Sequence, residues 1–188
     1  MNTLASHINE ALKIGKNLSK FSTYSCQPKT KEELIKIIND RIAEEGPECD
    51  LNDIDVSLIT DMTWLFNESD FNGNISEWDV SNVVDMSDMF CESSFNGDIS
   101  RWNVSKVEDM SGMFYESKFN QPIGDWNVSN VFDMYDMFNG SEFNQDISKW
   151  DTSKVKDIGF MFYKCDIKEE FKPKSIQESV YITDLIPR

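Results

Sequence analysis

Residues 71–94 read FNGNISEWDVSNVVDMSDMFCESS, and residues 95–118 repeat this stretch as FNGDISRWNVSKVEDMSGMFYESK with few changes. Two further copies follow without insertions and begin at Phe119 and Phe143. A fixed period of 24 residues is typical of solenoid proteins, in which each repeat forms one coil. Because a single coil cannot bury its apolar face alone, neighbouring coils must stack. The sequence therefore predicts a stack of coils, an architecture that favours a long binding surface over a catalytic pocket.

The apolar residues of the repeats fall into columns that recur every 24 positions. These columns begin at Phe71, Ile75, Trp78, Val83, Met89 and Phe90. We expect an α+β repeat solenoid, with short parallel strands near the Ile-x-x-Trp and Val-x-Asp-Met motifs and a single helical turn at Met-Phe. Parallel strands lie about 4.8 Å apart, so identical side chains are expected directly over one another.

The pattern divides the chain into three parts. They are an N-terminal helical cap (1–49), a solenoid of about five 24-residue repeats (50–165) and a C-terminal cap (166–188). A degenerate coil begins at Asp50, because the residues that follow it align with the repeats at the same period. At the other end, the stretch ESVYITDLI is expected to form a closing strand. The caps are needed because the end coils of a stack have only one neighbour.

Two helices are expected in the N-terminal cap. Leu4, Ile8 and Leu12 recur at four-residue spacing, which suits a short amphipathic helix over residues 2–20. Thr30 and Glu33 form a capping box that begins a second helix, and Gly46 and Pro47 end it. The residues of this second helix that should face the core are Leu34, Ile35, Ile37, Ile38 and Ile42.

Three polar columns recur as regularly as the apolar ones. They begin at Asn72, Ser81 and Asp61. Asn and Ser side chains can satisfy backbone groups that a tight turn leaves unpaired. Stacked carboxylates repel one another, so a persistent Asp predicts a hydrogen bond to a backbone N–H, as at a helix N-cap.

Acidic residues dominate the repeats. The chain of 188 residues carries a net charge of −16, with 39% hydrophobic and 28% charged residues, an ordinary composition for a globular protein. Residues 50–162 hold 22 acidic and six basic side chains, whereas the two flanking parts are each neutral. Such a surface repels nucleic acids and membranes and attracts basic partners. A second interpretation stays open, in which the charge only keeps an elongated protein soluble.

Residues suited to catalysis or metal binding are few. The four cysteines, Cys26, Cys49, Cys91 and Cys165, form no CxxC pair, and His7 is the only histidine. This pattern argues against a zinc site and against a Ser–His or Cys–His nucleophile. The aligned aspartates match neither an EF-hand nor a glycine-rich calcium repeat. We therefore expect no enzyme activity, no metal and no cofactor, and cysteines that are buried in a reducing compartment.

The sequence also gives an expectation for localisation. Its first residues, MNTLASHINEALKIGKNL, lack the apolar segment of a signal peptide, and no apolar run is long enough to span a membrane. We expect a cytoplasmic protein without membrane insertion, or a surface or secreted protein if a leader has been removed.

Positions that vary between repeats indicate the exposed surface. Phe132 stands in a column that also holds Val84, Glu108 and Lys156, and Tyr135 stands in a column that holds serine in the two preceding repeats. Aromatic side chains on an acidic surface are typical interface anchors. The predicted partner-binding residues are Phe132, Tyr135, Asp136, Glu108, Asp88 and Tyr115. The alternative that these aromatic side chains pack against a neighbouring coil stays open.

The phrase FNxDISxWxVSxVxDMSxMF resembles the repeats of the BspA-like leucine-rich-repeat surface proteins of bacteria. The similarity covers roughly residues 29–162 and includes the lead-in segments KTKEELIKIINDRI and DLNDIDVSLITDM. The resemblance implies a right-handed, leucine-rich-repeat-like coil. It also implies a role in binding proteins, often those of a host or a cell surface.

These observations favour a non-catalytic protein-binding module whose acidic face steers a basic protein partner, without direct binding of nucleic acid. One alternative is an intracellular acidic decoy that blocks the basic nucleic-acid-binding site of a defence nuclease, as a phage inhibitor would. Another alternative is a secreted or surface adhesin, as in the family that the repeats resemble. Neither the partner nor the oligomeric state follows from the sequence. The salt dependence of binding distinguishes the first two hypotheses. The affinity of a decoy should fall steeply as ionic strength rises, whereas the affinity of an aromatic interface should change little.

Overall fold

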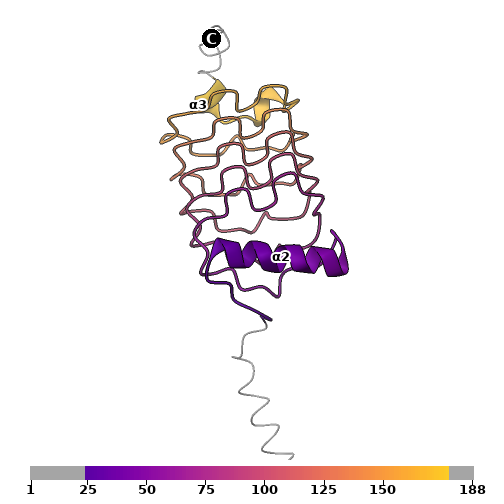
Figure 1. Cartoon of the computed structure of the whole chain (residues 1–188). Helices are drawn as coiled ribbons and strands as arrows, with labels where there is room; N and C mark the ends of the chain where they lie inside the picture. Colours follow the sequence, from indigo (N-terminus) through magenta and orange to yellow (C-terminus); the bar gives the residue numbers. More distant parts are fainter. Residues whose placement is uncertain (1–23, 178–188) are drawn as a thin grey trace, which may run out of the picture.

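The chain winds into a stack of coils. The computed structural model describes residues 24–177, and the elements within this range are α2 (Lys31–Glu45), the short 3₁₀ helix η2 (Glu169–Phe171) and α3 (Lys174–Gln177). Figure 1 shows the coils stacked along one direction, with α2 across one end of the stack and α3 at the opposite end. The helix predicted over 2–20 and the strand predicted in ESVYITDLI lie outside the described residues.

The predicted fold class, a leucine-rich-repeat-like α+β solenoid with short parallel strands and single helical turns, is wrong. Within residues 24–177 no strand forms, and parallel pairing is limited to isolated bridges. The bridges join Cys26 to Ile54, Asp50 to Asn74, and each of Asp61, Asp85, Asp109 and Asp133 to the residue 24 positions later. At the Met-Phe motif the backbone forms hydrogen-bonded turns in place of a helical turn, and the Met89 N–H donates to the Met86 carbonyl oxygen (3.2 Å).

Strands do not form because polar side chains bend the backbone at regular points. In the coil of residues 95–118, the side chains of Asp98, Asn103 and Asp109 each accept a hydrogen bond from the backbone N–H two residues later, at 2.9, 3.2 and 2.9 Å. Such Asx turns change the direction of the chain. They also occupy N–H groups that strand pairing would otherwise use. The recurring Asp, Asn and Ser residues therefore favour a coil of turns over a sheet.

The structure confirms that the predicted asparagine and aspartate columns satisfy backbone groups with their side chains, whereas the same prediction is wrong for the serine side chains. The Asn72 side-chain oxygen accepts a hydrogen bond from the Asn96 N–H (2.8 Å), and the same contact recurs along this column. Each member of the aspartate column that begins at Asp61 accepts a backbone N–H, although no helical turn follows it. The serine column takes part through its backbone, as where the Ser81 N–H donates to Asp79 (3.1 Å). The polar columns thus hold the bends of successive coils in line.

Identical apolar side chains lie over one another along the stack. The rings of Phe90 and Phe114 are 5.7 Å apart and nearly parallel, and those of Trp78 and Trp102 are 6.4 Å apart. The Trp102 indole N–H also donates to the Ile75 carbonyl oxygen of the preceding coil (3.1 Å). Full burial of such a side chain contributes roughly 1.5–3 kcal/mol. The hydrophobic stabilisation therefore arises between coils, and each coil depends on its neighbours.

One side of every coil, named the turn face below, carries a directional ladder of hydrogen bonds. It consists of residues 61–68, 85–92, 109–116, 133–140 and 157–164. The backbone N–H groups of Met86, Asp88, Phe90 and Glu92 donate to carbonyl oxygens 23 residues later, at 3.0, 2.8, 2.9 and 2.7 Å. The other coils repeat this pattern, with the N–H groups directed toward the C-terminal end. At residues 157–164 the ladder meets no further acceptor within the described part of the chain.

Helix α2 begins and ends as predicted. The Thr30 hydroxyl accepts a hydrogen bond from the Glu33 N–H (3.3 Å), and the Glu33 carboxylate accepts one from the Lys29 N–H (2.8 Å). The first contact confirms Thr30 as the N-cap, while Glu33 reaches the N–H one residue before the position that a capping box uses. At the other end, Gly46 adopts a φ of 91°, which favours glycine, and its N–H donates to the Ile42 carbonyl oxygen.

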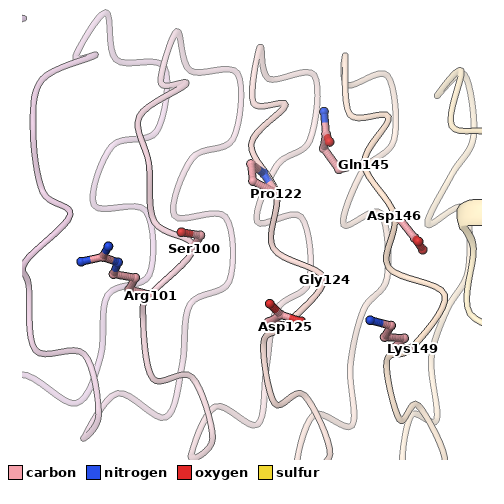
Figure 2. A pocket seen from close by; sticks show the side chains of 8 residues that line it. All are labelled: Ser100, Arg101, Pro122, Gly124, Asp125, Gln145, Asp146 and Lys149. Atoms are coloured by element: carbon pink, nitrogen blue, oxygen red, sulfur yellow. The ribbon is translucent and has the colours of Figure 1, made fainter.

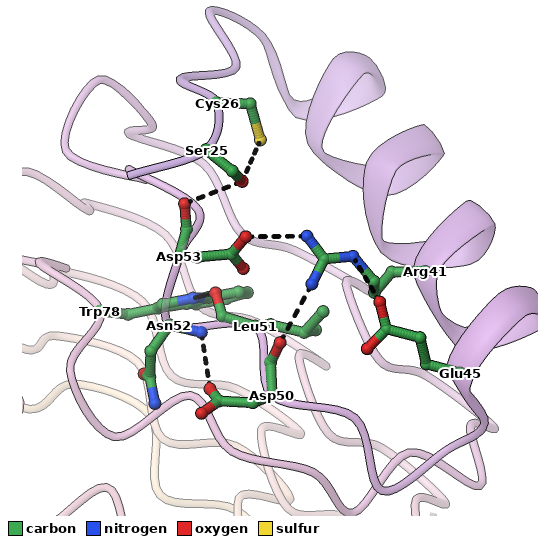
Figure 3. A network of polar contacts seen from close by, with 9 residues as sticks. All are labelled: Ser25, Cys26, Arg41, Glu45, Asp50, Leu51, Asn52, Asp53 and Trp78. Carbon is green, nitrogen blue, oxygen red and sulfur yellow. Dashed lines mark hydrogen bonds and ion pairs between the residues drawn. The ribbon is translucent and has the colours of Figure 1, made fainter. Parts of the chain in front are cut away.

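An apolar face and an ion pair attach α2 to the first coil. Leu34 and Ile38 are fully buried against the core. Figure 3 shows Arg41 reaching from the helix to Asp53, whose carboxylate oxygen lies 2.9 Å from the guanidinium. The Arg41 hydrogen bond, assisted by Ser25, lowers the pKa of Asp53. The helix thus supplies the apolar neighbour that the first coil would otherwise lack.

Candidate functional site on the turn face

The turn face has a left-handed backbone at two points in each coil. Asp88 and Glu92 have φ angles of 54° and 52°, and the equivalent residues of the other four coils also have positive φ. The first of these columns holds Trp64, Asp88, Gly112, Asp136 and Phe160. A left-handed residue with a side chain costs about 1–2 kcal/mol. Because the strain persists in every coil, the surrounding hydrogen bonds must fix these side chains in place.

The turn face is also where the negative charge is concentrated. Its first four segments, residues 61–68, 85–92, 109–116 and 133–140, contain nine acidic and no basic side chains. Basic residues of the repeats such as Arg101, Lys106, Lys149 and Lys154 lie on other sides of the coils. Two basic side chains reach the ends of the turn face, because Lys31 of α2 pairs with Asp61 (3.0 Å) and Lys164 belongs to the last segment. The three middle segments therefore carry a field of a single sign, which attracts cations and basic surfaces.

A hollow of about 370 Å³ lies in the middle of the turn face. It is lined by Asp88, Cys91, Ser111, Gly112, Tyr115, Tyr135 and Asp136. A Cβ atom on Gly112 would lie 2.2 Å from the Asp88 Oδ1 atom, so the Asp88 carboxylate occupies the space that a side chain at position 112 would take. The same column holds Asp88 in the coil before and Asp136 in the coil after. The hollow is therefore bordered by the backbone of Gly112 and by the carboxylates of Asp88 and Asp136.

Asp88 has an unusual electrostatic environment. Burial raises the pKa of its carboxyl group, and the nearby carboxylates of Asp109, Asp85 and Asp136 raise it further. Among the described residues, none donates a hydrogen bond to this side chain. Asp85, in contrast, accepts hydrogen bonds from the Ser87 N–H (2.9 Å) and hydroxyl (2.7 Å). A half-buried carboxylate with a raised pKa and no donor is a feature that often marks functional sites.

The structure brings four of the six predicted site residues together. Asp88, Tyr115, Tyr135 and Asp136 all line the hollow. Phe132 and Glu108 lie one above the other in a neighbouring column, where the Phe132 N–H donates to the Glu108 carbonyl oxygen (2.9 Å). Phe132 is 39% exposed and Tyr135 is 40% exposed, which confirms that both reach the surface. That these residues bind a partner stays a prediction.

Sequence reasoning missed two exposed aromatic residues of the turn face. Phe160, 51% exposed, packs edge to face against Tyr135 (6.1 Å between ring centroids) and against Tyr163 (5.8 Å). Trp64, 57% exposed, lies in the same column at the other end of the stack. This column varies between repeats as much as the column of Phe132 does. The same comparison of repeats, applied to this position, would have found both residues.

A second hollow, of about 460 Å³, lies on a different side of the stack (Figure 2). It is lined by Ser100, Arg101, Pro122, Gly124, Asp125, Gln145, Asp146 and Lys149. The coils approach closely here, since a Cβ atom on Gly124 would lie 2.3 Å from the Asp146 carbonyl oxygen. Two basic and two acidic side chains line this hollow, so it has no preference for ligands of either charge.

The described residues offer little for metal binding or thiol chemistry. Cys91 is buried beside the turn face, and this burial raises the pKa of its thiol to about 11, so the reactive thiolate is disfavoured. No group of three or more His, Cys, Asp or Glu side chains within residues 24–177 is arranged to hold a metal ion. In the same part of the chain, no helix has the length and apolar character needed to cross a membrane.

Comparisons with known proteins place the chain in a repeat family. Searches of curated proteins and of solved structures gave no match. A family described as "Mycoplasma protein of unknown function, DUF285" matches residues 40–141 and 115–177, a span that includes all the repeats. The match supports the interpretation of the sequence as a repeat protein, while the closer identification as a BspA-like protein stays a prediction. The chain therefore belongs to the DUF285 family.

Proposed function

We propose that this protein is a non-catalytic binding module whose turn face contacts a basic segment of another protein. The observation that carries the proposal is the position of exposed aromatic rings beside a surface of one charge. Tyr135, Phe160 and Tyr163 form a contiguous edge-to-face cluster. The first four turn-face segments, the last of which contains Tyr135, carry nine acidic residues and no basic one.

The two features have different roles in binding. Exposed aromatic rings supply large, rigid apolar area, and such residues account for much of the energy at protein interfaces. The carboxylates increase the rate of encounter with a basic partner and disfavour acidic ones. Together they favour a protein partner over a nucleic acid, whose phosphates the carboxylates repel.

The rigid backbone also supports a binding role. Each aromatic or acidic side chain of the turn face stands on a backbone fixed by the ladder of hydrogen bonds between coils. A surface that is already ordered loses little conformational entropy when a partner binds. The turn face thus meets a main requirement for tight recognition without a deep pocket.

The proposal can be tested by comparing two variants in the full chain. Tyr135→Ala combined with Phe160→Asn removes the centre of the aromatic cluster, and Asn tolerates the positive φ at position 160. Glu77→Ala, outside the turn face, serves as the matched control. Immobilised proteins would be incubated with extract of the source cells, and the amount of each captured protein would be measured.

A partner retained by the control and reduced at least about tenfold by the double variant supports the proposal, since a hot-spot residue contributes about 2 kcal/mol or more. Equal capture by both proteins refutes it. A salt titration of the captured complex then separates two kinds of partner. Binding that survives 0.5 M salt indicates the aromatic interface, whereas steep loss and competition by nucleic acid indicate the acidic decoy.

A further inference from the structure

The hollow at Gly112 has walls of two chemical kinds. Tyr115 and Tyr135, from adjacent coils, supply aromatic surface, and Asp88 and Asp136 supply carboxylates on either side of the gap. Its volume of about 370 Å³ is at the lower end of the range for small-molecule sites, and it suits one inserted side chain better than a whole metabolite. The hollow also opens directly on the surface that we propose as the interface.

The carboxylates at this hollow have unused capacity to accept hydrogen bonds. Asp88 receives none from the described residues, and its Oδ1 atom lies over Gly112, where a Cβ atom would be 2.2 Å away. Asp136 receives a side-chain hydrogen bond from Asn139 (2.6 Å). Asp109, in the other aspartate column, is in contrast satisfied by a backbone N–H and a serine hydroxyl. Asp88 therefore places free acceptors on the wall of the hollow.

A guanidinium group matches all of these features. It is planar, so it can stack on a tyrosine ring, and it is always protonated at physiological pH. It also presents five N–H donors, enough for two carboxylates at once. A cation over an aromatic ring gains further attraction from the ring electrons. An anion would be repelled by the carboxylates, and a purely apolar side chain would leave them without donors.

We propose that the hollow formed by Gly112, Tyr115, Tyr135, Asp88 and Asp136 receives an arginine side chain of the partner. This inference rests on the proposed function and names the residue type that the turn face recognises at its centre. Arginine enters between the two tyrosines, and its guanidinium lies between the two carboxylates. The absence of a side chain at Gly112 is then a requirement of binding, because a side chain there would displace the Asp88 carboxylate from the wall of the hollow.

The test uses the full, isotopically labelled chain and a short peptide as the probe. The peptide acetyl-Gly-Arg-Gly-amide is titrated while the backbone amide signals of Gly112 and Asp136 are followed by NMR. The matched peptide contains citrulline, which has the shape of arginine but no charge. We expect saturable shifts with the arginine peptide and at least tenfold weaker binding of the citrulline peptide.

Two variants of the chain make the test specific. Gly112→Asn introduces a side chain that tolerates the φ of 59°, adds no charge and displaces the Asp88 carboxylate from the wall of the hollow, and we expect at least a tenfold loss of affinity. Gly140→Asn makes the same change at a φ of 68° outside the hollow, and it should bind as the unaltered chain does. Equal binding by both variants, or equal binding of the two peptides, overturns the proposal.

Failure of this proposal can be told apart from failure of the proposed function. If the arginine peptide does not bind but capture of a partner still depends on Tyr135 and Phe160, only the arginine site is refuted. If the peptide binds saturably but capture does not depend on these residues, the site stands and the proposed interface is wrong.

Discussion

The two ends of the stack differ in how they complete the apolar columns. At the N-terminal end, α2 covers the first coil, and Leu34 and Ile38 are 0% and 2% exposed. On the turn face at the C-terminal end, Ile158 and Phe162 are only partly buried, although Met134 and Phe138 in the preceding coil are fully buried. The residues are similar and the backbone is the same. Burial in this protein is therefore decided by the number of neighbouring coils, and only secondarily by residue type.

The largest expected effect comes from deleting the same side chain in the middle and at the end of the stack. Phe114→Ala removes a fully buried ring that has a stacked neighbour on both sides, and it should lower the free energy of unfolding by about 3–5 kcal/mol. Phe162→Ala removes a partly buried ring with one stacked neighbour, and about 1–2 kcal/mol is expected. Urea denaturation of the two variants measures the difference. Equal losses would show that position in the stack does not set burial energy.

The covered end can be weakened from the helix side. Ile38→Ala should cost about 2–4 kcal/mol, because it opens a cavity between α2 and the first coil. Ile42→Ala, at a partly buried position of the same helix, is the control and should cost clearly less. Circular dichroism and tryptophan fluorescence during urea unfolding would show whether α2 and the coils lose structure together. A first transition limited to the helix, with the coils unaffected, would contradict the role of α2 as a needed neighbour.

Backbone strain should have a smaller effect on the free energy of unfolding. The effect should be of opposite sign for substitutions at two positions of the same column. Gly112 in the middle of the stack and Phe160 in the last coil have φ angles of 59° and 55°. Gly112→Ala should destabilise the protein by at least about 1–2 kcal/mol, since it adds a left-handed residue with a side chain and its Cβ atom also displaces the Asp88 carboxylate. Phe160→Gly should stabilise it by up to about 1 kcal/mol, because it relieves the same strain. Thermal unfolding measures both shifts, and a loss of stability in Phe160→Gly would show that its edge-to-face contacts outweigh the strain.

The smallest expected effect is a difference in how Asp53 and Asp88 make the stability of the protein depend on pH. Asp53 at the covered end has a lowered pKa, because of the hydrogen bond from Arg41 above all, so its contribution is present at neutral pH and is lost as the pH falls through this pKa. Asp88 on the turn face has a raised pKa because of burial and like charges, so its ionisation opposes folding as the pH rises. At neutral pH, Asp53→Asn should destabilise and Asp88→Asn should stabilise, each by about 0.5 kcal/mol after allowance for solvent screening.

Stability curves for these two variants between pH 3 and 7 provide the check. Both differences from the unaltered chain should shrink at the acid end, because protonation then removes the charges that the substitutions remove. Differences that do not change with pH would show that packing, and not charge, is responsible. The Asp88→Asn variant should also bind the arginine peptide more weakly. Such a trade of stability for binding is common at functional sites.

The sequence predicted the columns and the helix cap but not the backbone. A 24-residue period reveals that Trp78 and Trp102 lie over each other, and a capping box at Thr30 locates the start of α2. The same letters do not distinguish strands from turns. Asp98 and Asn103 are compatible with both strands and turns. In the structure their side chains stabilise turns by accepting backbone hydrogen bonds, and strands do not form there. Fold prediction failed where short-range polar contacts override the tendency of stacked coils to form a sheet.

The candidate site was predicted in part for a similar reason. Tyr135 and Phe132 stand out because they replace polar residues of other repeats, and this signal is contained in the sequence. The hollow at Gly112 depends on an absent side chain and on the position of the Asp88 carboxylate over it, which require coordinates. The column of Phe160 varies between repeats as much as that of Phe132, so the same comparison of repeats predicts Phe160 as an exposed aromatic residue.

The one-way ladder of hydrogen bonds on the turn face means that the molecule can change length only in whole units. Each N–H donates to an oxygen 23 residues ahead, so an insertion that is not a whole number of repeats would misalign the pairs that span it. Duplicating residues 95–118 would preserve the whole lattice and copy Gly112 with it. Adding whole repeats would therefore lengthen the stack and its turn face. Each added coil would be stabilised by the same hydrogen bonds and apolar contacts that join the present coils.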